Sequence, residues 1–517
     1  MSPLNNEINK KITRFGYVLN KKSVDDKILN EIKKDLTVKP FRSGNFGKFC
    51  KKDESFPLYV ENGDYIGIPK YYGLDKLGKP DINKLDLYNY PKYDMNYLGK
   101  LRPIQESNVD KVCKGLDNGG GGLLLAQCGS GKTNMAIYIA CKYKLKTLFI
   151  VHKTFLKNQA IDRIKSVTNI KKVGIIQRKT IEIDHPFVVA MVQSLARIDY
   201  NDEIFKDFGM IIIDEVHHMG ARNFSKVYQK MSARYMLGIS AERRRNDGLY
   251  KIINWYMGPI LHEEPQKPND RVIVKKFFYK TSNQNRSEVI INKYTKEPDR
   301  STMITNLVYI KRRNRFIIKL IKKLFDQGKN ILCLSGRIAQ VNLFYKLLNE
   351  NKYLKGNVGK YIGKMSEKDL DISGKKQVIL GSYSMAEEGL DIENLNVVIL
   401  CTPKSAIKQS VGRILRKEIY EEHPIVIDIV DVCNHIFKSQ SNTRNQHYNK
   451  QKYNIQEFKV CDFHSDGFEY WTDLNFIDKS LLKIPKESST KKFPEKSFPE
   501  KSFIGPIDYS TIDFLDD

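Results

Sequence analysis

Short apolar runs alternate with amphipathic segments along most of this chain, and this alternation restricts its fold more than any other feature. Near-continuous runs of Ile, Val and Leu are typical of strands buried on both faces of a parallel sheet. Segments such as 134–144 and 155–167 have helical spacing, so the first part of the chain predicts a doubly wound α/β domain. Its apolar runs lie at residues 123–128, 147–151, 187–192, 210–214 and 235–240.

The same pattern starts again after Arg271, beyond a polar stretch at 263–271. Helical segments at 339–350 and 406–418 alternate with a second series of apolar runs. A chain of 517 residues is also too long for one core, since single cores stop growing near ~250–300 residues. We therefore predict the α/β class, with two parallel-sheet domains in tandem. The second series of runs lies at 330–335, 358–363, 377–382, 396–401 and 424–431.

Two regions lie outside this pattern. The N-terminal region is basic and rich in Tyr, with weak strand signals, and it forms either a small domain that faces nucleic acid or a packed extension. A near-repeat of Lys, Pro and Ser at 491–503 cannot bury a core, so we predict a disordered C-terminal tail. The predicted divisions are 1–95 (accessory domain), 96–262 (first α/β domain), 263–435 (second α/β domain) and 436–517 (C-terminal extension).

The chain is strongly basic, with 87 Lys and Arg against 60 Asp and Glu and a formal net charge of +27. An excess of this size favours a polyanionic partner, although a Lys-rich composition alone is the alternative. The eight cysteines contain no CxxC pair, which argues against a zinc module or a secreted disulfide framework. No apolar run approaches the ~18 residues of a membrane span, and the first residues lack an apolar targeting segment. We expect a soluble, intracellular protein with no membrane partner.

A glycine-rich loop follows the first predicted strand, in the stretch GGGGLLLAQCGSGKT. Strand, loop and helix come in the order that a phosphate-binding loop requires. Backbone N–H groups are expected to face the phosphates of ATP, with Lys132 at the β- and γ-phosphates and Thr133 on Mg²⁺. The usual first Gly is replaced by Ala126, and a glycine-rich turn that merely contains Lys is the alternative. The predicted nucleotide-binding residues of the loop are Ala126, Gln127, Cys128, Gly129, Ser130, Gly131, Lys132 and Thr133.

The stretch MIIIDEVHHMG (210–220) ends a predicted buried strand on two acids. Ligands of open α/β sheets lie beyond the carboxyl ends of the strands, so Asp214 and Glu215 are expected beside the phosphate loop. We predict that Asp214 binds Mg²⁺ and that Glu215 orients and deprotonates the attacking water. His217 is interpreted as a polar link from the ATP site, and His218 as a turn residue. A zinc site is disfavoured, because adjacent side chains at a strand end point apart.

With these residues in place, the chain resembles the superfamily 2 helicases. The resemblance covers about residues 96–430 and is greatest for the XPB/UvsW-like branch. Within that branch the chain is most similar to the poxviral transcript-release DNA helicase and its counterparts in other large DNA viruses. The motifs that carry it are, in chain order, LRPIQ (101–105), the phosphate loop, MVQSLA (191–196), DEVH (214–217), LGISAERRRNDGL (237–249), GSYSMAEEGLDI (381–392) and QSVGRILR (409–416).

The resemblance implies roles for residues in these motifs. Gln105 corresponds to the residue that contacts adenine. Ser240 and Ala241 belong to motif III, which with His217 couples hydrolysis to strand movement. Glu242 and Arg243 stand where relatives have Thr and Pro, a departure that bears on this coupling and leaves ATP binding intact. Three residues of motif V are implied in the nucleotide site, namely Glu388, Gly389 and Asp391.

Motif VI contributes Gln409, Arg413 and Arg416. The two arginines lie three apart on a predicted helix and therefore project from one face of the second domain. A guanidinium against the γ-phosphate stabilises the charge that develops during hydrolysis, an effect worth ~10³–10⁵ in rate. These side chains are expected to touch the phosphate only when the two domains close. A strand of nucleic acid is expected across both domains, with contacts mainly to phosphates. The candidate contacts are Gln193, Ser194, Ser335, Arg337 and Ser382.

Together these features predict an enzyme that uses ATP and Mg²⁺ to move along or unwind nucleic acid. The resemblance implies DNA as the favoured track, in transcription termination, repair or recombination, with an RNA polymerase complex as a partner. It also implies a viral protein in the cytoplasm of an infected cell or in a virion, and we expect a monomer. An RNA helicase and an ATPase that remodels a polymerase without unwinding remain alternatives. A basic scaffold with a decayed ATP site is disfavoured, because the motif residues are all present.

Overall fold

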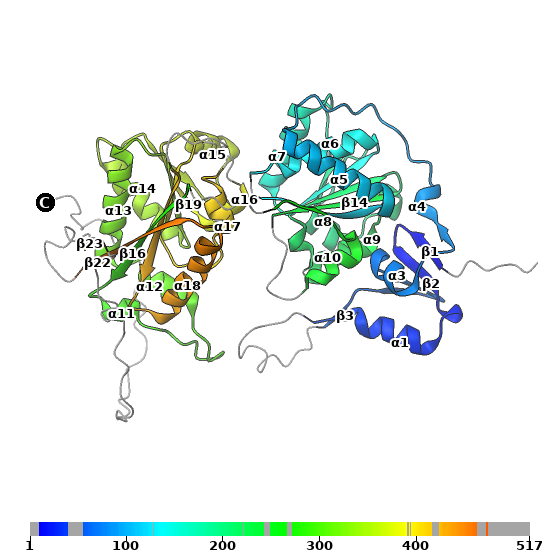
Figure 1. Cartoon of the computed structure of the whole chain (residues 1–517), viewed down its shortest axis with the longest axis horizontal. Coiled ribbons are helices and arrows are strands. Elements are labelled where there is room, and N and C mark those ends of the chain that lie inside the picture. The colour runs from blue at the N-terminus through cyan, green and yellow to red at the C-terminus, as the bar shows by residue number, and fades with distance from the viewer. Residues whose placement is uncertain are drawn as a thin grey trace, which may run out of the picture. The chain divides into compact units, whose positions relative to one another are not determined.

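The computed structural model describes residues 10–39, 55–127, 129–220, 222–241, 249–265, 271–389, 392, 394–415, 423–462 and 472–473. The chain divides into two compact units, Met1–Lys267 with Lys293–Glu297, and Pro268–Asn292 with Pro298–Asp517. Figure 1 shows that each unit contains a twisted sheet with helices on both of its faces. The predicted tail at 491–503 lies outside the described residues.

The first unit is built around an eight-stranded sheet in which every strand pair except β10–β11 is parallel. Because the strands run the same way, their carboxyl ends meet at one edge of the sheet. The spatial order of the strands is β11 (Thr180–Ile181), β10 (Gly174–Gln177), β12 (Phe187–Met191), β9 (Thr147–Val151), β13 (Met210–Asp214), β14 (Tyr235–Ser240), β8 (Gly121–Leu125) and β15 (Ile260–Glu263).

Successive residues of each strand pack on opposite faces of this sheet. In β13, Met210 and Ile212 enter one buried cluster, whereas Ile211 and Ile213 enter the other. This alternation explains the continuous apolar runs, since both faces need apolar side chains. The covering helices on the two faces are α5 (Pro103–Gly119), α6 (Lys132–Tyr143) and α7 (Thr154–Val167), and α8 (Val192–Arg197), α9 (Arg222–Lys230) and α10 (Tyr250–Met257).

The N-terminal region forms a smaller sheet that belongs to the same unit. Its β1–β2 and β2–β6 pairs are antiparallel, and β7 adds to β1 in parallel. The strand order is β5 (Val60–Asn62), β6 (Tyr65–Ile68), β2 (Gly16–Asn20), β1 (Lys10–Thr13) and β7 (Ile82–Asn83). The remaining elements are α1 (Asp26–Asp35), α3 (Lys70–Leu77), α4 (Lys84–Leu87) and the short pair β3 (Thr37–Val38) with β4 (Phe56–Pro57).

The N-terminal region is fixed to helix α10 of the parallel-sheet domain through α3 and through Leu58, between β4 and β5. The rings of Tyr72 and Trp255 meet edge to face at 5.3 Å, and the Tyr256 hydroxyl donates to the Leu58 carbonyl at 2.6 Å. Buried residues of both parts form one continuous apolar cluster. The described residues of the N-terminal region therefore share a core with the first α/β domain.

The second unit repeats the parallel-sheet architecture. Its strand order is β18 (Val358–Tyr361), β19 (Val378–Ser382), β17 (Ile331–Ser335), β20 (Val397–Leu400), β21 (Ile425–Asp431), β16 (Ile273–Lys280), β22 (Asn454–Cys461) and β23 (Thr472–Asp473). Only β23 is antiparallel to its neighbour. The helices are α11 (Gln284–Ser287), α12 (Arg300–Leu307), α13 (Lys311–Asp326), α14 (Ile338–Glu350), α15 (Glu367–Gly374), α16 (Tyr383–Gly389), α17 (Lys408–Gly412) and α18 (His435–Lys450).

Two buried ion pairs connect helices to strand β21 of the second unit. Arg313 of α13 binds both carboxylate oxygens of Asp431, at 2.6 and 2.9 Å. Arg444 of α18 binds Asp428 in the same two-pronged way, at 2.9 and 2.8 Å. Both pairs are almost fully buried, and Tyr448 also donates to Asp428 at 3.0 Å. A lost partner would leave a charge buried and unpaired, so these pairs fix where the helices dock.

The predicted fold class, two tandem parallel-sheet domains, is confirmed. The predicted runs match strands of the two large sheets within a few residues, whereas β10, β11, β15, β16, β22 and β23 were not predicted. Residues beyond 435 form α18 and β22, and β22 pairs in parallel with β16. The helix predicted at 406–418 is shorter among the described residues, where α17 spans Lys408–Gly412. The Arg413 N–H donates to the carbonyls of Ser410 and Val411, which are closer in the chain than the partner four residues back that an α-helix requires. Among the described residues, no helix combines the length and apolarity needed to cross a bilayer.

A buried lysine lies where the small sheet meets the parallel-sheet domain. Lys70 begins α3 and is 4% exposed. Its ammonium lies beside the carboxyl-terminal end of α5, so close to Gly120 that a Cβ there would lie 3.0 Å from Nζ. Burial lowers the pKa of Lys70 from 10.5 to about 8, with the Asp86 carboxylate acting in the opposite direction. The helix C-terminus favours a cation, but it does not replace the water that Lys70 loses.

We predict that Lys70→Met stabilises the first unit. Because the folded pKa lies below the unfolded value, the cost of the buried ammonium is complete below about pH 8 and disappears as the pH rises toward 10.5. Lys70→Met should therefore raise the free energy of unfolding by up to about 3 kcal/mol at pH 7, and by much less at pH 10. Urea unfolding followed by Trp255 fluorescence, with Trp471 replaced by Phe, measures this. Lys79→Met, at an exposed site, should change little, and an equal gain at both pH values would contradict the prediction.

Candidate active site

The glycine-rich loop leaves β8 at the carboxyl edge of the first sheet. Gly129 and Gly131 both have φ of +82°, a conformation that glycine adopts without steric cost, and α6 begins at Lys132. Ala126 has no such positive φ, and its N–H donates to the Ser240 carbonyl at 3.0 Å, which continues the pairing with β14. The first loop position therefore does not require Gly, and Ala is compatible with the loop.

The Lys132 side chain points back into the loop that precedes it. Its ammonium donates to the carbonyls of Ala126 at 3.1 Å and Gln127 at 3.0 Å, and the residue is 9% exposed. The Gln127 backbone N–H donates to Glu264 at 3.1 Å, directly beyond β15. Thr133 follows on the first turn of α6 and is partly exposed. Cys128 lies outside the described residues.

Gln105 and Arg102 hold the loop from helix α5. The Gln105 amide nitrogen and the Arg102 guanidinium each donate to the Ser130 carbonyl at 2.8 Å. The Gln105 amide oxygen accepts from the Arg102 backbone N–H at 2.9 Å and caps the helix. Gln105 is 5% exposed, so in this structure its amide supports the loop. A Cβ at Gly131 would lie 2.3 Å from this amide nitrogen, which explains why Gly131 has no side chain.

The two acids of β13 lie at the same edge and differ in proton affinity. Burial, followed by the charge of Glu215, raises the pKa of Asp214 to about 6, and the Glu215 N–H donates to Asp214 at 2.9 Å. Burial would also raise the pKa of Glu215, but the contact with His217 and the charge of Lys132 lower it to about 2. Glu215 has a positive φ of 47°, so the backbone turns sharply between the two acids. Two crowded carboxylates near a lysine form a donor set that suits a hard cation.

His217 lies between the second acid and the end of β14. Its Nδ1 is 3.2 Å from a Glu215 carboxylate oxygen and 2.9 Å from the Ser240 hydroxyl. Both His217 and Ser240 are buried. The Ser240 carbonyl in turn accepts from Ala126, so one buried serine contacts both the glycine-rich loop and the histidine. Ala241 follows and is also buried.

A row of imidazole rings continues from this point to β9. The His218 ring lies 4.1 Å from that of His217 and 4.2 Å from that of His152, measured between ring centroids. The Gln193 amide donates to the His152 backbone carbonyl. Gln193 and Ser194 belong to α8, where nucleic-acid contacts were predicted. His218 lies in a short 3-10 turn, where its N–H donates to the Glu215 carbonyl at 3.0 Å, and its ring also contacts two other histidines.

The residues predicted to contact nucleic acid differ in how far they are buried. Ser335 and Ser382 are register partners at the ends of β17 and β19. Ser335 is 2% exposed and its hydroxyl donates to Gln340, while Arg337 donates to Thr305 and Ser301. Ser194 is also buried and accepts from the Arg178 N–H. Ser194 and Ser335 thus hold loops in place, whereas Gln193, Arg337 and Ser382 are partly exposed.

Motif VI differs from the predicted arrangement. Gln409 lies on α17, but Arg413 follows the end of that helix, and Arg416 lies outside the described residues. Helix α17 thus ends before Arg413, next to Gly412, a poor helix former, and the relation of Arg413 to Arg416 stays a prediction. In motif V, Glu388 and Gly389 end α16, their side chains are not described, and Asp391 lies outside the described residues.

Three residues at this site were not predicted. Arg102 lies in the quoted LRPIQ segment, but its contact with the loop depends on how α5 packs. His152 directly follows the buried run at 147–151, so the rule that identified Asp214 would also have found it. Glu264 follows β15, a strand without a clear apolar run, and the sequence gives no comparable signal for it.

We predict that Gly131→Ala weakens ATP binding at least about tenfold. The added methyl would require a disfavoured left-handed backbone and would displace the Gln105 amide from Ser130. Titration with a fluorescent ATP analogue measures the change, with circular dichroism as a check on folding. Gly119→Ala is the matched control, because a Cβ there meets nothing within 4 Å. Equal affinities of the two variants would show that the loop geometry does not govern nucleotide binding.

Comparisons with known proteins identify the family of this chain. A family model described as "Type III restriction enzyme, res subunit" matches residues 98–245, and "Helicase conserved C-terminal domain" matches residues 312–418. The chain is 63% identical over 516 residues, 99% of both chains, to "Putative ATP-dependent RNA helicase L396" of Acanthamoeba polyphaga mimivirus. It is 25% identical over 404 residues, 76% of this chain and 82% of the other, to "Probable helicase D10" of Escherichia phage T5. T4 UvsW aligns with 88% of this chain and 99% of its own, at 18% identity and a TM-score of 0.35. The chain belongs to the superfamily 2 helicases, an ATP-hydrolysing family with members in large DNA viruses.

Proposed function

We propose that this helicase couples ATP hydrolysis to movement along nucleic acid, with DNA as its favoured track. The observation that carries the proposal is the contact series from the glycine-rich loop through Ser240 and His217 to Glu215. Such a series connects the residues that hold phosphates to those that activate water. The net charge of +27 supports a polyanionic track.

The residues of the first unit have distinct roles in this proposal. Lys132 exchanges its two loop carbonyls for phosphate oxygens of ATP, and the loop N–H groups bind the same phosphates. Thr133 and Asp214 would hold Mg²⁺, which when bound neutralises phosphate charge. Glu215 remains ionised because its pKa is low, so it can orient the attacking water and accept its proton. Gln105 holds the loop through the Ser130 carbonyl, and we assign the contact with the adenine ring of ATP to the same side chain.

The second unit supplies the guanidinium groups. We assign Arg413 and Arg416 to the charge that develops on the γ-phosphate, with Gln409 as their companion in motif VI. Glu388, Gly389 and Asp391 are assigned to the nucleotide side of motif V. In this proposal ATP favours a closed arrangement, and hydrolysis releases it. Repeated closure would move the chain along a strand.

An RNA track is the second candidate, and one observation favours it. The mimivirus relative, 63% identical over nearly the whole chain, carries the words RNA helicase in its name. The XPB/UvsW-like motif pattern favours DNA instead. The contacts that would distinguish a 2′-hydroxyl from a deoxyribose require a bound strand, so the polymer that stimulates hydrolysis must decide between the two.

The first experiment measures ATP hydrolysis with single-stranded DNA, double-stranded DNA or RNA. Stimulation by DNA above RNA is expected, and the reverse order would assign an RNA track. Lys132→Ala should abolish the activity, and Arg416→Ala should reduce kcat by about 10³-fold or more. Lys142→Ala, an exposed lysine on the same helix α6, should retain full activity. Stimulation without strand displacement would instead indicate an ATPase that remodels a nucleic-acid complex.

A second prediction concerns coupling through Ser240. Ser240→Ala removes the hydroxyl that contacts His217 but keeps the backbone carbonyl that accepts from Ala126. We expect hydrolysis without polymer to change less than about threefold and stimulation by polymer to fall at least about tenfold, since a lost buried hydrogen bond costs about 1–3 kcal/mol. Parallel loss of both activities would show that Ser240 serves only the nucleotide site.

A further inference from the structure

The N-terminal sheet has one face in the apolar core and one face that faces a groove. Successive residues of a strand point to opposite sides. Ile12, Tyr17 and Leu19 are buried in the core, whereas Lys11, Thr13 and Val18 line the groove on the other side. The residues of β5 and β6 on this second face are Val60, Asn62, Tyr65 and Gly67.

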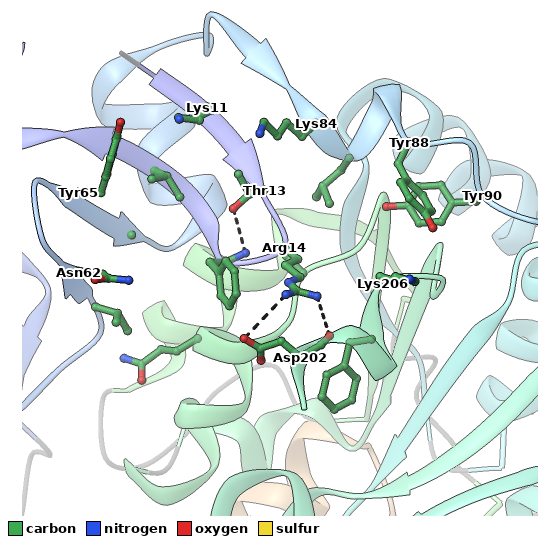
Figure 2. A pocket seen from close by; sticks show the side chains of 18 residues that line it. Lys11, Thr13, Arg14, Asn62, Tyr65, Lys84, Tyr88, Tyr90, Asp202 and Lys206 are labelled. Atoms are coloured by element: carbon green, nitrogen blue, oxygen red, sulfur yellow. Dashed lines mark hydrogen bonds and ion pairs between the residues drawn. The ribbon is translucent and has the colours of Figure 1, made fainter. Parts of the chain in front are cut away.

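The opposite wall of the groove comes from the parallel-sheet domain of the same unit. It consists of the turn η2 (Asp202–Phe205), Lys206 and the end of α9. Arg14 fastens the two walls together, because its guanidinium donates to the Asp202 carbonyl at 2.6 Å and lies 3.8 Å from the Asp202 carboxylate. Figure 2 shows Lys11, Lys84 and Tyr88 around this space, with Arg14 and Asp202 joined across it. The cavity measures about 670 Å³ and is open to solvent.

Cations outnumber anions in this groove. Four basic side chains line it, and Asp202 is the only acid among the lining residues that the structure describes. Arg14 is already bound to Asp202, and Lys206 lies 3.3 Å from Glu203. Lys11 of β1 is partly exposed and Lys84 of α4 is exposed. The four basic residues are Lys11, Arg14, Lys84 and Lys206.

Exposed aromatic rings lie beside these cations. Phe15 at the β1–β2 turn is 41% exposed, and Tyr65 and Tyr88 are exposed to almost the same extent. Lys11 Nζ lies 4.9 Å from the centre of the Tyr65 ring, and the Arg14 guanidinium lies 5.0 Å from that of Phe15. The Tyr88 hydroxyl donates to Asp207 at 2.7 Å, which fixes its ring against Tyr90. Large apolar rings are costly to leave in water, so their grouping here indicates a binding surface.

We propose that this groove binds one or two unpaired nucleotides of the nucleic-acid track, as a single-strand site separate from the helicase motifs. Bases would stack on Phe15, Tyr65 and Tyr88, and phosphates would meet Lys11 and Lys84. Basic grooves with exposed rings are the usual means of holding single strands without sequence preference, because every base has a π-face. The proposal rests on the proposed function, since it presumes a nucleic-acid track.

The place of the groove in the unit supports a strand over a free nucleotide. Helix α9, whose end forms one wall, packs beside α8, which carries Gln193. Lys230 of α9 bonds to the Ile198 carbonyl and the Asp199 carboxylate, directly after α8. These contacts lie at the carboxyl-terminal ends of α8 and α9, whereas Gln193 is on the first turn of α8, so a polymer that contacts both Gln193 and the groove would have to run along α8. A duplex does not fit a concave space of this volume, whereas one or two splayed nucleotides do.

The experiment measures binding and hydrolysis separately on the full chain. Fluorescence anisotropy with labelled oligo(dT) and oligo(U), without ATP, gives the affinity. The double variant Lys11→Ala/Lys84→Ala should bind at least about tenfold more weakly, and its slope of log K against log salt should fall by about 1.4, since each phosphate contact contributes about 0.7. Phe15→Ala should weaken binding at least about fivefold through lost stacking. At saturating polymer, kcat for ATP should remain unchanged while KM for the polymer rises.

The matched control is Lys34→Ala/Lys79→Ala, which removes the same charge from exposed sites of the same region outside the groove. Equal losses in both double variants would reduce the effect to net charge and overturn the site. Full affinity in Phe15→Ala and in the groove double variant would do the same. Displacement of the labelled oligomer by AMP alone would assign a mononucleotide pocket instead.

Crosslinking separates this proposal from the proposed function. An oligomer that carries 5-iododeoxyuridine should crosslink to Phe15, Tyr65 or Tyr88, and peptide mapping would locate the bond. If no polymer stimulates hydrolysis but the crosslink forms, the motor proposal fails and the groove stands. If a polymer stimulates hydrolysis but crosslinks form only near Gln193, the groove proposal fails and the motor stands.

Discussion

Three parallel strands, β8, β14 and β13, end at the same edge of the first sheet, and the ATP site depends on how closely their ends are held. The register places Leu125 opposite Ser240 and Asp214 opposite Ile239. Ser240 then contacts the glycine-rich loop with its carbonyl and His217 with its hydroxyl. A shift of one residue in this pairing would turn both groups to the wrong face. The apolar strand interiors, which fix the register, therefore position the polar chemistry.

In the second unit, buried ion pairs fix the helices against the parallel sheet. Its strand β21 carries two buried carboxylates, which are bound by arginines of α13 and α18. Neither pair contributes chemistry, yet each determines where a helix and its following loop lie. Buried ion pairs of this kind are weak evidence for stability but strong determinants of geometry.

Much of the architecture could be predicted from the chain, because each buried strand is a continuous apolar run. The strands β9, β13 and β14 match their predicted bounds, and Asp214 and Glu215 lie at the end of β13, as predicted. The prediction from apolar runs fails where charged residues interrupt a strand, as Lys275 and Lys276 do in β16. The Gln105 contact with Ser130 and the groove around Phe15 escaped prediction because they depend on packing between distant segments. The altered motif III residues Glu242 and Arg243 lie outside the described part of the chain.

The placement of β22 has a consequence for how the second domain can be handled as a fragment. β16 enters the sheet first in sequence, and β22 returns from beyond motif VI to cover its other edge along eight residues. The rings of Phe277 and Phe458 stack across this pair at 5.0 Å. A protein truncated soon after residue 431 would present the backbone donors and acceptors of β16, and the face of Phe277, to other molecules. Such an edge is a template for intermolecular pairing. Expression boundaries taken from helicase motifs alone would therefore yield aggregates, whereas a fragment that ends after residue 462 retains a covered sheet.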